Sequence, residues 1–140
     1  MSAENTKGLK LVVTSILRYQ SKILILKRSS KTKSMQNRWG CISGYLEPYE
    51  DQLTRALTEI FEETGIGYEQ LILQKILYPV PVVLDDKVTF VIQPFCFSSK
   101  VDCVKLNWEH IEFKWIRIVD TKFFDLVPKL DDLINCCFKN

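Results

Sequence analysis

The sequence predicts an α/β fold in which helices pack on a mixed β-sheet. Five or six segments are rich in apolar and β-branched residues, which is typical of strands. One central and one terminal segment instead place their apolar residues at helical spacing. The chain has 140 residues, which fits one domain over residues 1–140. Helices interspersed among strands favour a layered arrangement with one central sheet.

The first half of the chain begins with two strands. Residues 9–19 are rich in apolar and β-branched side chains, and residues 22–27 alternate Lys-Ile-Leu-Ile-Leu-Lys as a hairpin partner. Residues 28–38 are polar, so we expect mostly loop there. Residues 39–44 are expected to form a short strand or turn that leads into an acidic segment.

The second half contributes further strands. Residues 71–83 and 88–98 are apolar, and the polar residues 85–87 between them predict a turn, so we expect a long hairpin. Another strand is expected over residues 112–119.

Two helices are expected. The central helix covers residues 51–64, and Glu50 and Asp51 place negative charge at its positive end. Gly65 follows as a stop, because glycine readily adopts the left-handed conformation that ends a helix. The terminal helix covers residues 129–138, directly after Pro128.

Composition argues against several classes of function. The net charge of +2 is too small to favour nucleic acid or membranes through bulk electrostatics. The apolar runs are far shorter than a membrane span, and the polar N-terminus lacks the apolar core of a secretory signal. We therefore expect a cytoplasmic protein without a membrane partner, and we do not expect nucleic acid as a partner.

The cysteines predict free thiols. Their odd number, the lack of a secretion signal and the absence of Cys-x-x-Cys spacing argue against a disulfide framework or a structural zinc site. We expect them to be small buried residues in a reducing cytosol. They are Cys41, Cys96, Cys103, Cys136 and Cys137.

The central helix carries three crowded carboxylates, Glu59, Glu62 and Glu63. At about 100° per residue, they share one face with Arg55. The opposite face is an apolar stripe that can pack on a sheet: Leu53, Ala56, Leu57, Ile60 and Thr64. Like charges this close repel one another unless they share a cation, which favours a divalent-metal site. The alternative is a solvated acidic face.

The spacing around these glutamates resembles the Nudix box of the Nudix hydrolase superfamily. That box reads Gly-x5-Glu-x7-Arg-Glu-U-x-Glu-Glu-x-Gly-U, where U is aliphatic, and residues 44–66 follow it at every fixed position but one. The matching residues are Gly44, Glu50, Glu59, Ile60, Glu62, Glu63, Gly65 and Ile66.

Flanking segments extend the resemblance over nearly the whole chain. Residues 39–44 look like the family's Trp-x-x-x-Gly-Gly entry, with Ser43 in place of the first glycine. Residues 47–50 are similar to its Glu-x-Gly-Glu, with Tyr49 in place of the glycine. Residues 109–116 resemble the Glu-His-x-x-x-x-Trp segment of many members.

The resemblance implies the Nudix α/β/α sandwich, with a mixed β-sheet between helices, and a MutT-like activity. The implied reaction is hydrolysis of a pyrophosphate bond in a nucleoside diphosphate linked to another group, most simply a nucleoside triphosphate or a related compound. The implied cofactor is Mg²⁺ or Mn²⁺, which carboxylate oxygens suit as hard ligands. The implied partner is a small-molecule nucleotide, bound by a monomer or homodimer.

Roles follow from the matched positions. Glu59, Glu62 and Glu63 are expected to be catalytic and to bind the metal, with the backbone at Ser43 and Gly44 as a further ligand. Supporting or substrate-binding roles are expected at six other positions. Glu50 and Arg55 are expected to orient the ligands, and Arg28, Trp39, Glu47 and Glu109 to contact substrate.

The family's arginine is replaced here by Thr58. In one hypothesis Arg55 takes over its role from one turn earlier, since Arg55 and Glu59 are i,i+4 neighbours. In a second, Arg55 is only a solvated surface charge. In a third, the site has become a weakened or inactive nucleotide-binding or sensing module.

Overall fold

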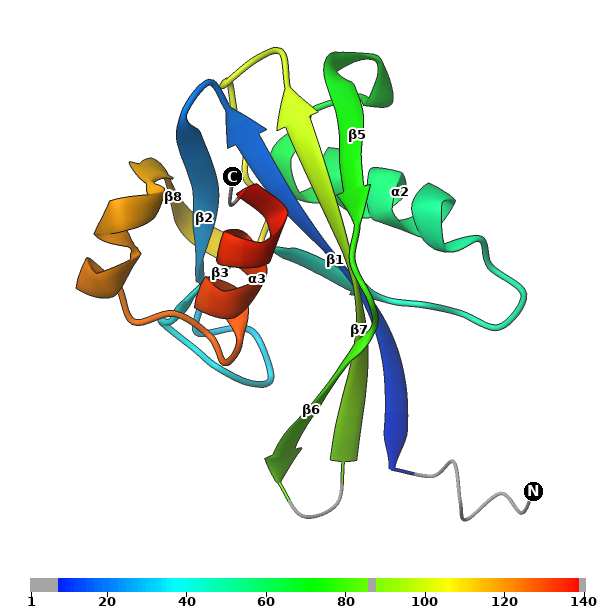
Figure 1. Cartoon of the computed structure of the whole chain (residues 1–140). Coiled ribbons are helices and arrows are strands. Elements are labelled where there is room, and N and C mark those ends of the chain that lie inside the picture. Colours follow the sequence, from blue (N-terminus) through cyan, green and yellow to red (C-terminus); the bar gives the residue numbers. More distant parts are fainter. Residues whose placement is uncertain (1–7, 86–87, 139–140) are drawn as a thin grey trace.

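The computed structural model describes residues 8–85 and 88–138 (Figure 1). In the described residues eight strands form one sheet, five of which follow the order β3-β2-β1-β7-β5. Of the other three, β4 pairs with β1, β6 pairs with β7, and β8 pairs with β2. Among the strand pairs of the described residues, β1 and β7 pair in parallel and the others are antiparallel, so the sheet is mixed. The strands are β1 (Leu9–Tyr19), β2 (Lys22–Arg28), β3 (Trp39–Gly40), β4 (Ile42–Tyr45), β5 (Leu71–Ile76), β6 (Val80–Asp85), β7 (Val88–Ser99) and β8 (His110–Arg117).

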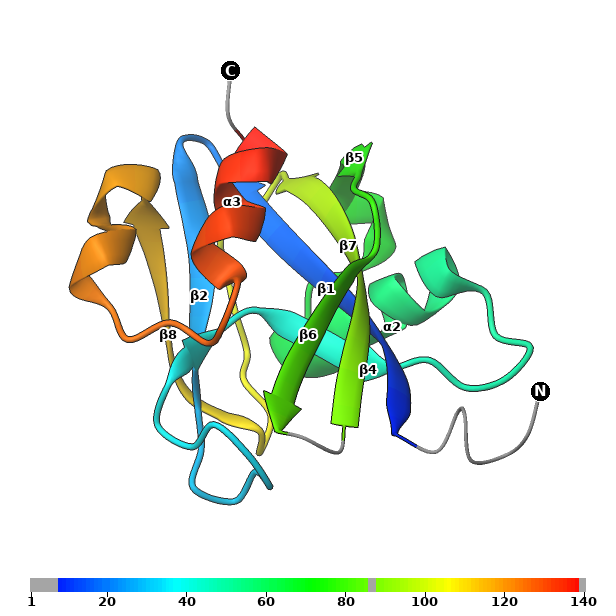
Figure 2. The same cartoon turned by 60° about the horizontal axis from the view of Figure 1, so that its bottom comes forward.

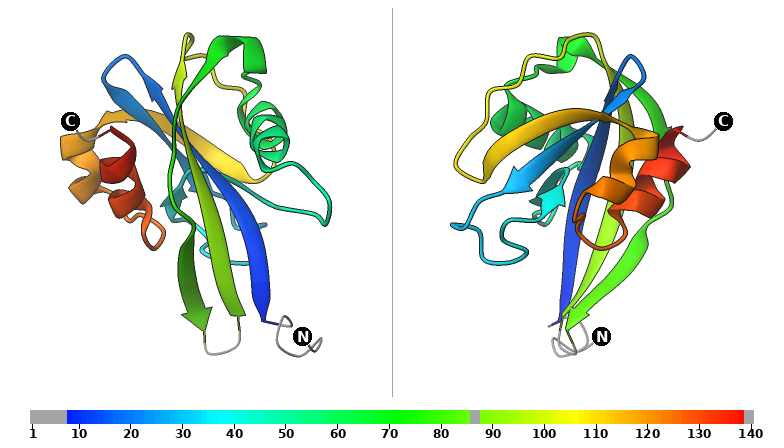
Figure 3. Two further views of the ribbon diagram at one scale, coloured as in Figure 1. Left: turned by 45° about the vertical axis from the view of Figure 1, so that its right-hand side comes forward. Right: turned by 90° about the vertical axis from the view of Figure 1, so that its left-hand side faces the viewer.

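Two α-helices and two short 3₁₀ helices complete the described chain. The helices are α2 (Gln52–Thr64), α3 (Leu130–Phe138), η1 (Tyr68–Gln70) and η2 (Ile118–Phe123). The left view of Figure 3 shows α2 and α3 on opposite sides of the sheet, and Figure 2 shows α3 in front of β1 and β2. The predicted α/β/α arrangement is therefore confirmed.

Strand alternation explains how one sheet serves both helices. Successive strand side chains point to opposite faces, so neighbours in sequence enter different cores. Leu17 of β1 packs in a cluster with Ile60 of α2. The adjacent Ile16 packs in a second cluster with Ile134 of α3. Each helix thus covers its own row of apolar strand residues.

Most expected elements are confirmed, with three corrections. The sheet has eight strands, where we expected five or six. The strand expected over residues 71–83 is divided into β5 and β6, because Pro79 in the intervening segment lacks a backbone N–H to continue the ladder. The last strand ends at Arg117 and continues as η2, where we expected it to reach Val119. Of the expected turn over residues 85–87, residues 86–87 lie outside the described residues.

The expectation of free cysteines is wrong for one pair. Cys96 of β7 and Cys137 of α3 form a disulfide between residues 41 positions apart. Both lie in the core between α3 and the sheet, where helix packing brings them together. Cys41, Cys103 and Cys136 are free. Counting cysteines along the chain could not reveal this spatial proximity.

No helix within the described residues has both the length and the apolar character needed to cross a bilayer.

Candidate active site

The acidic helix is held by defined ends. Asp51 caps its N-terminus, where the carboxylate accepts hydrogen bonds from the backbone N–H and the hydroxyl of Thr54, both at 2.9 Å. At the other end Gly65 adopts φ +77° and donates its N–H to the Phe61 carbonyl at 2.9 Å. The predicted stop at Gly65 is confirmed, so the register of the glutamates along α2 is fixed.

Strand β4 brings the residues before the helix against its acidic side. Gly44 lies so close to Glu59 that a Cβ atom at Gly44 would overlap the glutamate side chain. A larger residue at position 44 would therefore displace Glu59. On the same strand Ser43 shares a 2.9 Å hydrogen bond with the hydroxyl of Thr14 in β1. Ser43, Gly44 and Glu59 consequently lie at one place in the fold.

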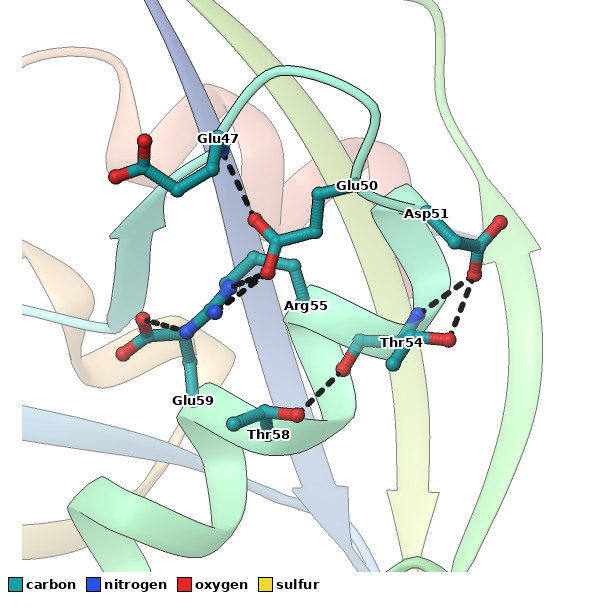
Figure 4. A network of polar contacts seen from close by, with 7 residues as sticks. All are labelled: Glu47, Glu50, Asp51, Thr54, Arg55, Thr58 and Glu59. Carbon is teal, nitrogen blue, oxygen red and sulfur yellow. Dashed lines mark hydrogen bonds and ion pairs between the residues drawn. The ribbon is translucent and has the colours of Figure 1, made fainter.

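Arg55 organises the N-terminal half of the helix (Figure 4). Its Nε and Nη2 donate to Oε2 of Glu50 at 2.8 and 2.5 Å, and its Nη1 donates to Oε1 of Glu59 at 3.1 Å. Glu50 also accepts a 2.9 Å hydrogen bond from the backbone N–H of Glu47. The hydrogen bonds from Arg55 and Glu47 hold the pKa of Glu50 below its usual range. Both carboxylates are thus compensated by the protein.

Thr58 takes no part in this network. Its hydroxyl donates to the Thr54 carbonyl of its own helix at 2.8 Å (Figure 4). The arginine that the resemblance places at position 58 is absent, and the guanidinium that reaches Glu59 comes from Arg55 instead.

Glu63 lies in a different environment from Glu59. Its side chain is only 1% exposed, and Nδ1 of His110 in β8 lies 3.7 Å from its Oε1. In the part of the chain that the structure describes, neither carboxylate oxygen of Glu63 and neither ring nitrogen of His110 has a hydrogen-bond partner. The helical wheel placed Glu63 on a face with Glu59 and Glu62, but the structure buries Glu63 and leaves Glu62 exposed.

Negative charge accumulates around Glu63. Burial raises its pKa well above 4.5, and the carboxyl groups of Glu109 and Glu59 raise it further, while Arg28 opposes them. Burial and Glu59 likewise raise the pKa of Glu109. Burial, together with Arg28, lowers the pKa of His110 to about 4, so the imidazole is neutral at pH 7 and adds no compensating charge.

A cleft of about 370 Å³ opens beside these groups. Five of the predicted site residues line it: Arg28, Ser43, Gly44, Glu59 and Glu109. Among the described residues that line the cleft, Arg28 is the only cation. The rest of the wall comes largely from apolar side chains of the sheet and from the start of α3.

The cleft also has aromatic residues that our sequence analysis missed. Tyr45 and Phe90 stack with ring centroids 6.4 Å apart and an interplanar angle of 29°, and Trp108 is 62% exposed at the same cleft. Tyr45 follows Ser43 by two residues on β4, so strand alternation could have placed it on the same face. Phe90 could not have been assigned, because its neighbour Tyr45 is distant in sequence.

Other predicted residues do not line the cleft. Trp39 is 9% exposed and packs edge-on against Phe124 at 5.4 Å, as a core residue does, so the expected substrate contact is not supported. Glu47 is exposed and contributes its backbone to Glu50. Glu62 is exposed on α2, although its charge still raises the pKa of Glu109.

The donor set fits a hard divalent cation. Within the described residues no three His, Cys, Asp or Glu side chains already converge as a metal cluster. The carboxylate of Glu63, which has no hydrogen-bond partner among the described residues, is unfavourable in its ionised form unless a compensating group binds it. Carboxylate oxygens are the ligands that Mg²⁺ and Mn²⁺ prefer, and Glu59, Glu62, Glu63 and Glu109 supply them around one region.

Comparison with known proteins gives matches in structure. No protein-family model and no curated protein matches the chain in sequence. The structure is similar to that of a MutT protein from Methanosarcina mazei Go1, with a TM-score of 0.79, 24% identity and 92% of each chain covered.

Two further solved structures are similar over most of their length. One is a Caenorhabditis elegans Ap4A hydrolase in a binary complex, with a TM-score of 0.76, 19% identity, and 90% of this chain and 93% of that chain covered. The other is the Nudix domain of Shewanella oneidensis NrtR complexed with ADP ribose, with a TM-score of 0.78, 18% identity, and coverage of 96% and 90%.

Proposed function

Since this chain has the fold of the Nudix hydrolases, we propose that it hydrolyses a pyrophosphate bond in a nucleotide, with Mg²⁺ or Mn²⁺ as cofactor. The observation that carries the proposal is Glu63, a buried carboxylate with no hydrogen-bond partner among the described residues, whose neighbours Glu59 and Glu109 line the cleft together with Arg28. The substrate class is a nucleoside diphosphate linked to another group, such as a nucleoside triphosphate. We propose a cytoplasmic location and a monomeric or homodimeric state as well.

The chain's acidic residues would hold the cofactor. Glu59, Glu62 and Glu63 supply carboxylate oxygens, and the backbone at Ser43 and Gly44 lies beside Glu59. A bound divalent cation neutralises diphosphate charge and lowers the pKa of a water molecule. In the absence of such a cation, these carboxylates would repel the phosphates of the substrate.

The remaining cleft residues suit the two ends of a nucleotide. Arg28 supplies positive charge for a phosphate, because a guanidinium binds phosphate oxygens through several N–H groups. Tyr45, Phe90 and Trp108 supply aromatic faces on which a base can stack. Glu109 shares the cleft with Arg28 and would orient a water molecule or a substrate hydroxyl.

Arg55 would keep Glu59 in position. Its ion pairs with Glu50 and Glu59 have distances of 2.5 and 3.1 Å, and all three side chains are at most 23% exposed. Partly buried guanidinium–carboxylate pairs restrict rotation more than a fully exposed pair does. This supports replacement of the missing arginine by Arg55.

The rival function is nucleotide binding without hydrolysis. The observation that favours it is the same ion pair, because Arg55 occupies an oxygen of Glu59 that a cation would otherwise use.

A substrate panel separates the two functions. Nucleoside triphosphates, dinucleoside polyphosphates and ADP-ribose would be incubated with the full chain and Mg²⁺ or Mn²⁺. Product that forms with the wild-type chain and disappears with Glu62→Gln supports hydrolysis. Tight binding of a panel member without turnover of any would support the binding module.

A further inference from the structure

Glu63 and His110 form an isolated polar pair inside the protein. Both side chains are 1% exposed, and Oε1 of Glu63 and Nδ1 of His110 are 3.7 Å apart. That distance exceeds the range of about 2.7–3.2 Å for an N–H···O hydrogen bond. Within residues 8–85 and 88–138, the carboxylate oxygens of Glu63 and the ring nitrogens of His110 have no assigned hydrogen-bond partner, although the carboxyl group of Glu59 also lies near enough to raise the pKa of Glu63. A small side-chain adjustment would therefore join the two groups that each need a partner.

The two residues lie on elements that the core packing anchors. His110 begins β8, where it pairs with Arg28 of β2. Glu63 is in the last turn of α2, one turn after the fully buried Ile60. The core thus fixes both backbones and leaves the side-chain torsions to set the contact.

We propose that His110 is the positioning residue for Glu63: its Nδ1–H donates to Oε1 and leaves the other carboxylate oxygen for a divalent cation. This rests on the proposed function, in which Glu63 is a metal ligand. Nδ1 is the ring nitrogen that faces Glu63, and a neutral imidazole has one N–H with which to donate. Residues that orient metal ligands commonly do so through such a hydrogen bond.

Position 110 would then do for Glu63 what Arg55 does for Glu59. Arg55 donates to one oxygen of its glutamate at 3.1 Å. The two glutamates are four residues apart on α2, and each would be held by one donor, from the helix itself in one case and from β8 in the other.

Two amide substitutions test which ring nitrogen matters. The Asn side-chain amide lies near the place of Nδ1, and the Gln amide lies near that of Nε2. Mn²⁺ alone would be titrated into the metal-free full chain, and binding measured by calorimetry and by the loss of the free-Mn²⁺ electron paramagnetic resonance signal. We expect His110→Asn to bind Mn²⁺ within a few-fold of the wild type. We expect His110→Gln and His110→Phe to bind it about 10–100-fold more weakly.

A control separates positioning from loss of stability. Ile116→Val removes one methylene from the buried side of the same strand without touching Glu63. We expect it to lower the thermal midpoint and leave Mn²⁺ affinity unchanged. If His110→Phe does not fold, the comparison of Asn with Gln decides.

Equal Mn²⁺ affinity for the wild type and His110→Phe, or better rescue by Gln than by Asn, would overturn the positioning role. Failure of the proposed function is seen separately, in the wild type alone. A wild type that binds Mn²⁺ but hydrolyses no nucleotide refutes the hydrolase while the ranking of the His110 variants still supports positioning.

Discussion

The carboxylates along helix α2 lie in two different electrostatic environments. Glu50, just before the helix, and Glu59, near its middle, share the guanidinium of Arg55, whose positive charge balances them. Glu63, in the last turn of the helix, is more deeply buried and has no hydrogen-bond partner in the described part of the chain. Burying a charge is unfavourable unless it is paired. We propose that an external cation balances Glu63, as Arg55 balances Glu50 and Glu59.

The difference between Glu59 and Glu63 also bears on Thr58, which stands where the Nudix box has arginine. Arg55 is held by two carboxylates on its own side of the helix and does not extend to Glu63 in this structure. We therefore infer that the ionised form of Glu63 depends on a bound cation for its charge compensation.

The largest predicted effect comes from changing Glu63. Glu63→Gln keeps the size of the side chain but removes the charge that would bind the cation. We expect Mg²⁺-dependent turnover to fall at least about 100-fold, which corresponds to roughly 3 kcal/mol of lost transition-state stabilisation. Turnover would be measured by phosphate or pyrophosphate release. Glu69→Gln, at an exposed position in η1, is the matched control and should retain activity. Equal activity of Glu63→Gln and the control would refute a role for Glu63 in the reaction.

A smaller effect is expected from changing Arg55, which pairs with Glu50 and Glu59. Arg55→Ala frees Glu59 to rotate, and we expect turnover to fall about 10–100-fold, as for other residues that orient metal ligands. The double variant Arg55→Ala/Thr58→Arg restores the arginine to the position that the Nudix box gives it and should recover much of the activity. Steady-state kinetics of both variants checks this. Unchanged turnover in Arg55→Ala would mean that Arg55 is only a surface charge.

The sequence could predict the environment of Glu59 but not that of Glu63. The Arg55–Glu59 contact follows from helix geometry alone, because residues four apart are neighbours. The burial of Glu63 does not follow, because it depends on where β8 and the residues before it cross the helix. The N–H of Lys105 in that segment binds the carbonyl of Thr64 at 2.8 Å, so the segment covers the end of α2.

The same reason explains other differences. Local patterns predicted the helix and its stop at Gly65 and most strands, since each depends on a few adjacent residues. The Cys96–Cys137 disulfide and the Tyr45–Phe90 pair depend on tertiary packing between distant segments. The core position of Trp39 depends on Phe124, which the sequence alone could not place beside it.

The smallest predicted effect concerns the loop before helix α2. Tyr49 has φ +66°, where the related motif has glycine, and its side chain is fully exposed. Left-handed backbone is unfavourable for a residue with a Cβ atom, so Tyr49→Gly should stabilise the protein by about 0.5–1 kcal/mol. Tyr68→Gly is the control, because Tyr68 is exposed but has no positive φ, and it should destabilise. Chemical denaturation of both variants measures the change. A destabilised Tyr49→Gly variant would indicate that the tyrosine ring makes a stabilising contact.

Thermal unfolding of the wild type and Glu63→Gln, with and without Mg²⁺, tests the central claim most directly. Because burial and neighbouring carboxyl groups raise the pKa of Glu63, its favourable contribution to stability is complete below pH 4.5 and is lost as the pH rises through the raised value. Without a cation, Glu63→Gln should therefore be more stable than the wild type at pH 8, and the difference should shrink towards pH 4.5. Mg²⁺ at pH 8 should stabilise the wild type, because a ligand that binds only the folded state favours it, and should have little effect on Glu63→Gln. Equal stabilisation of both proteins by Mg²⁺, with no advantage for Glu63→Gln in its absence, would contradict a cation site at Glu63.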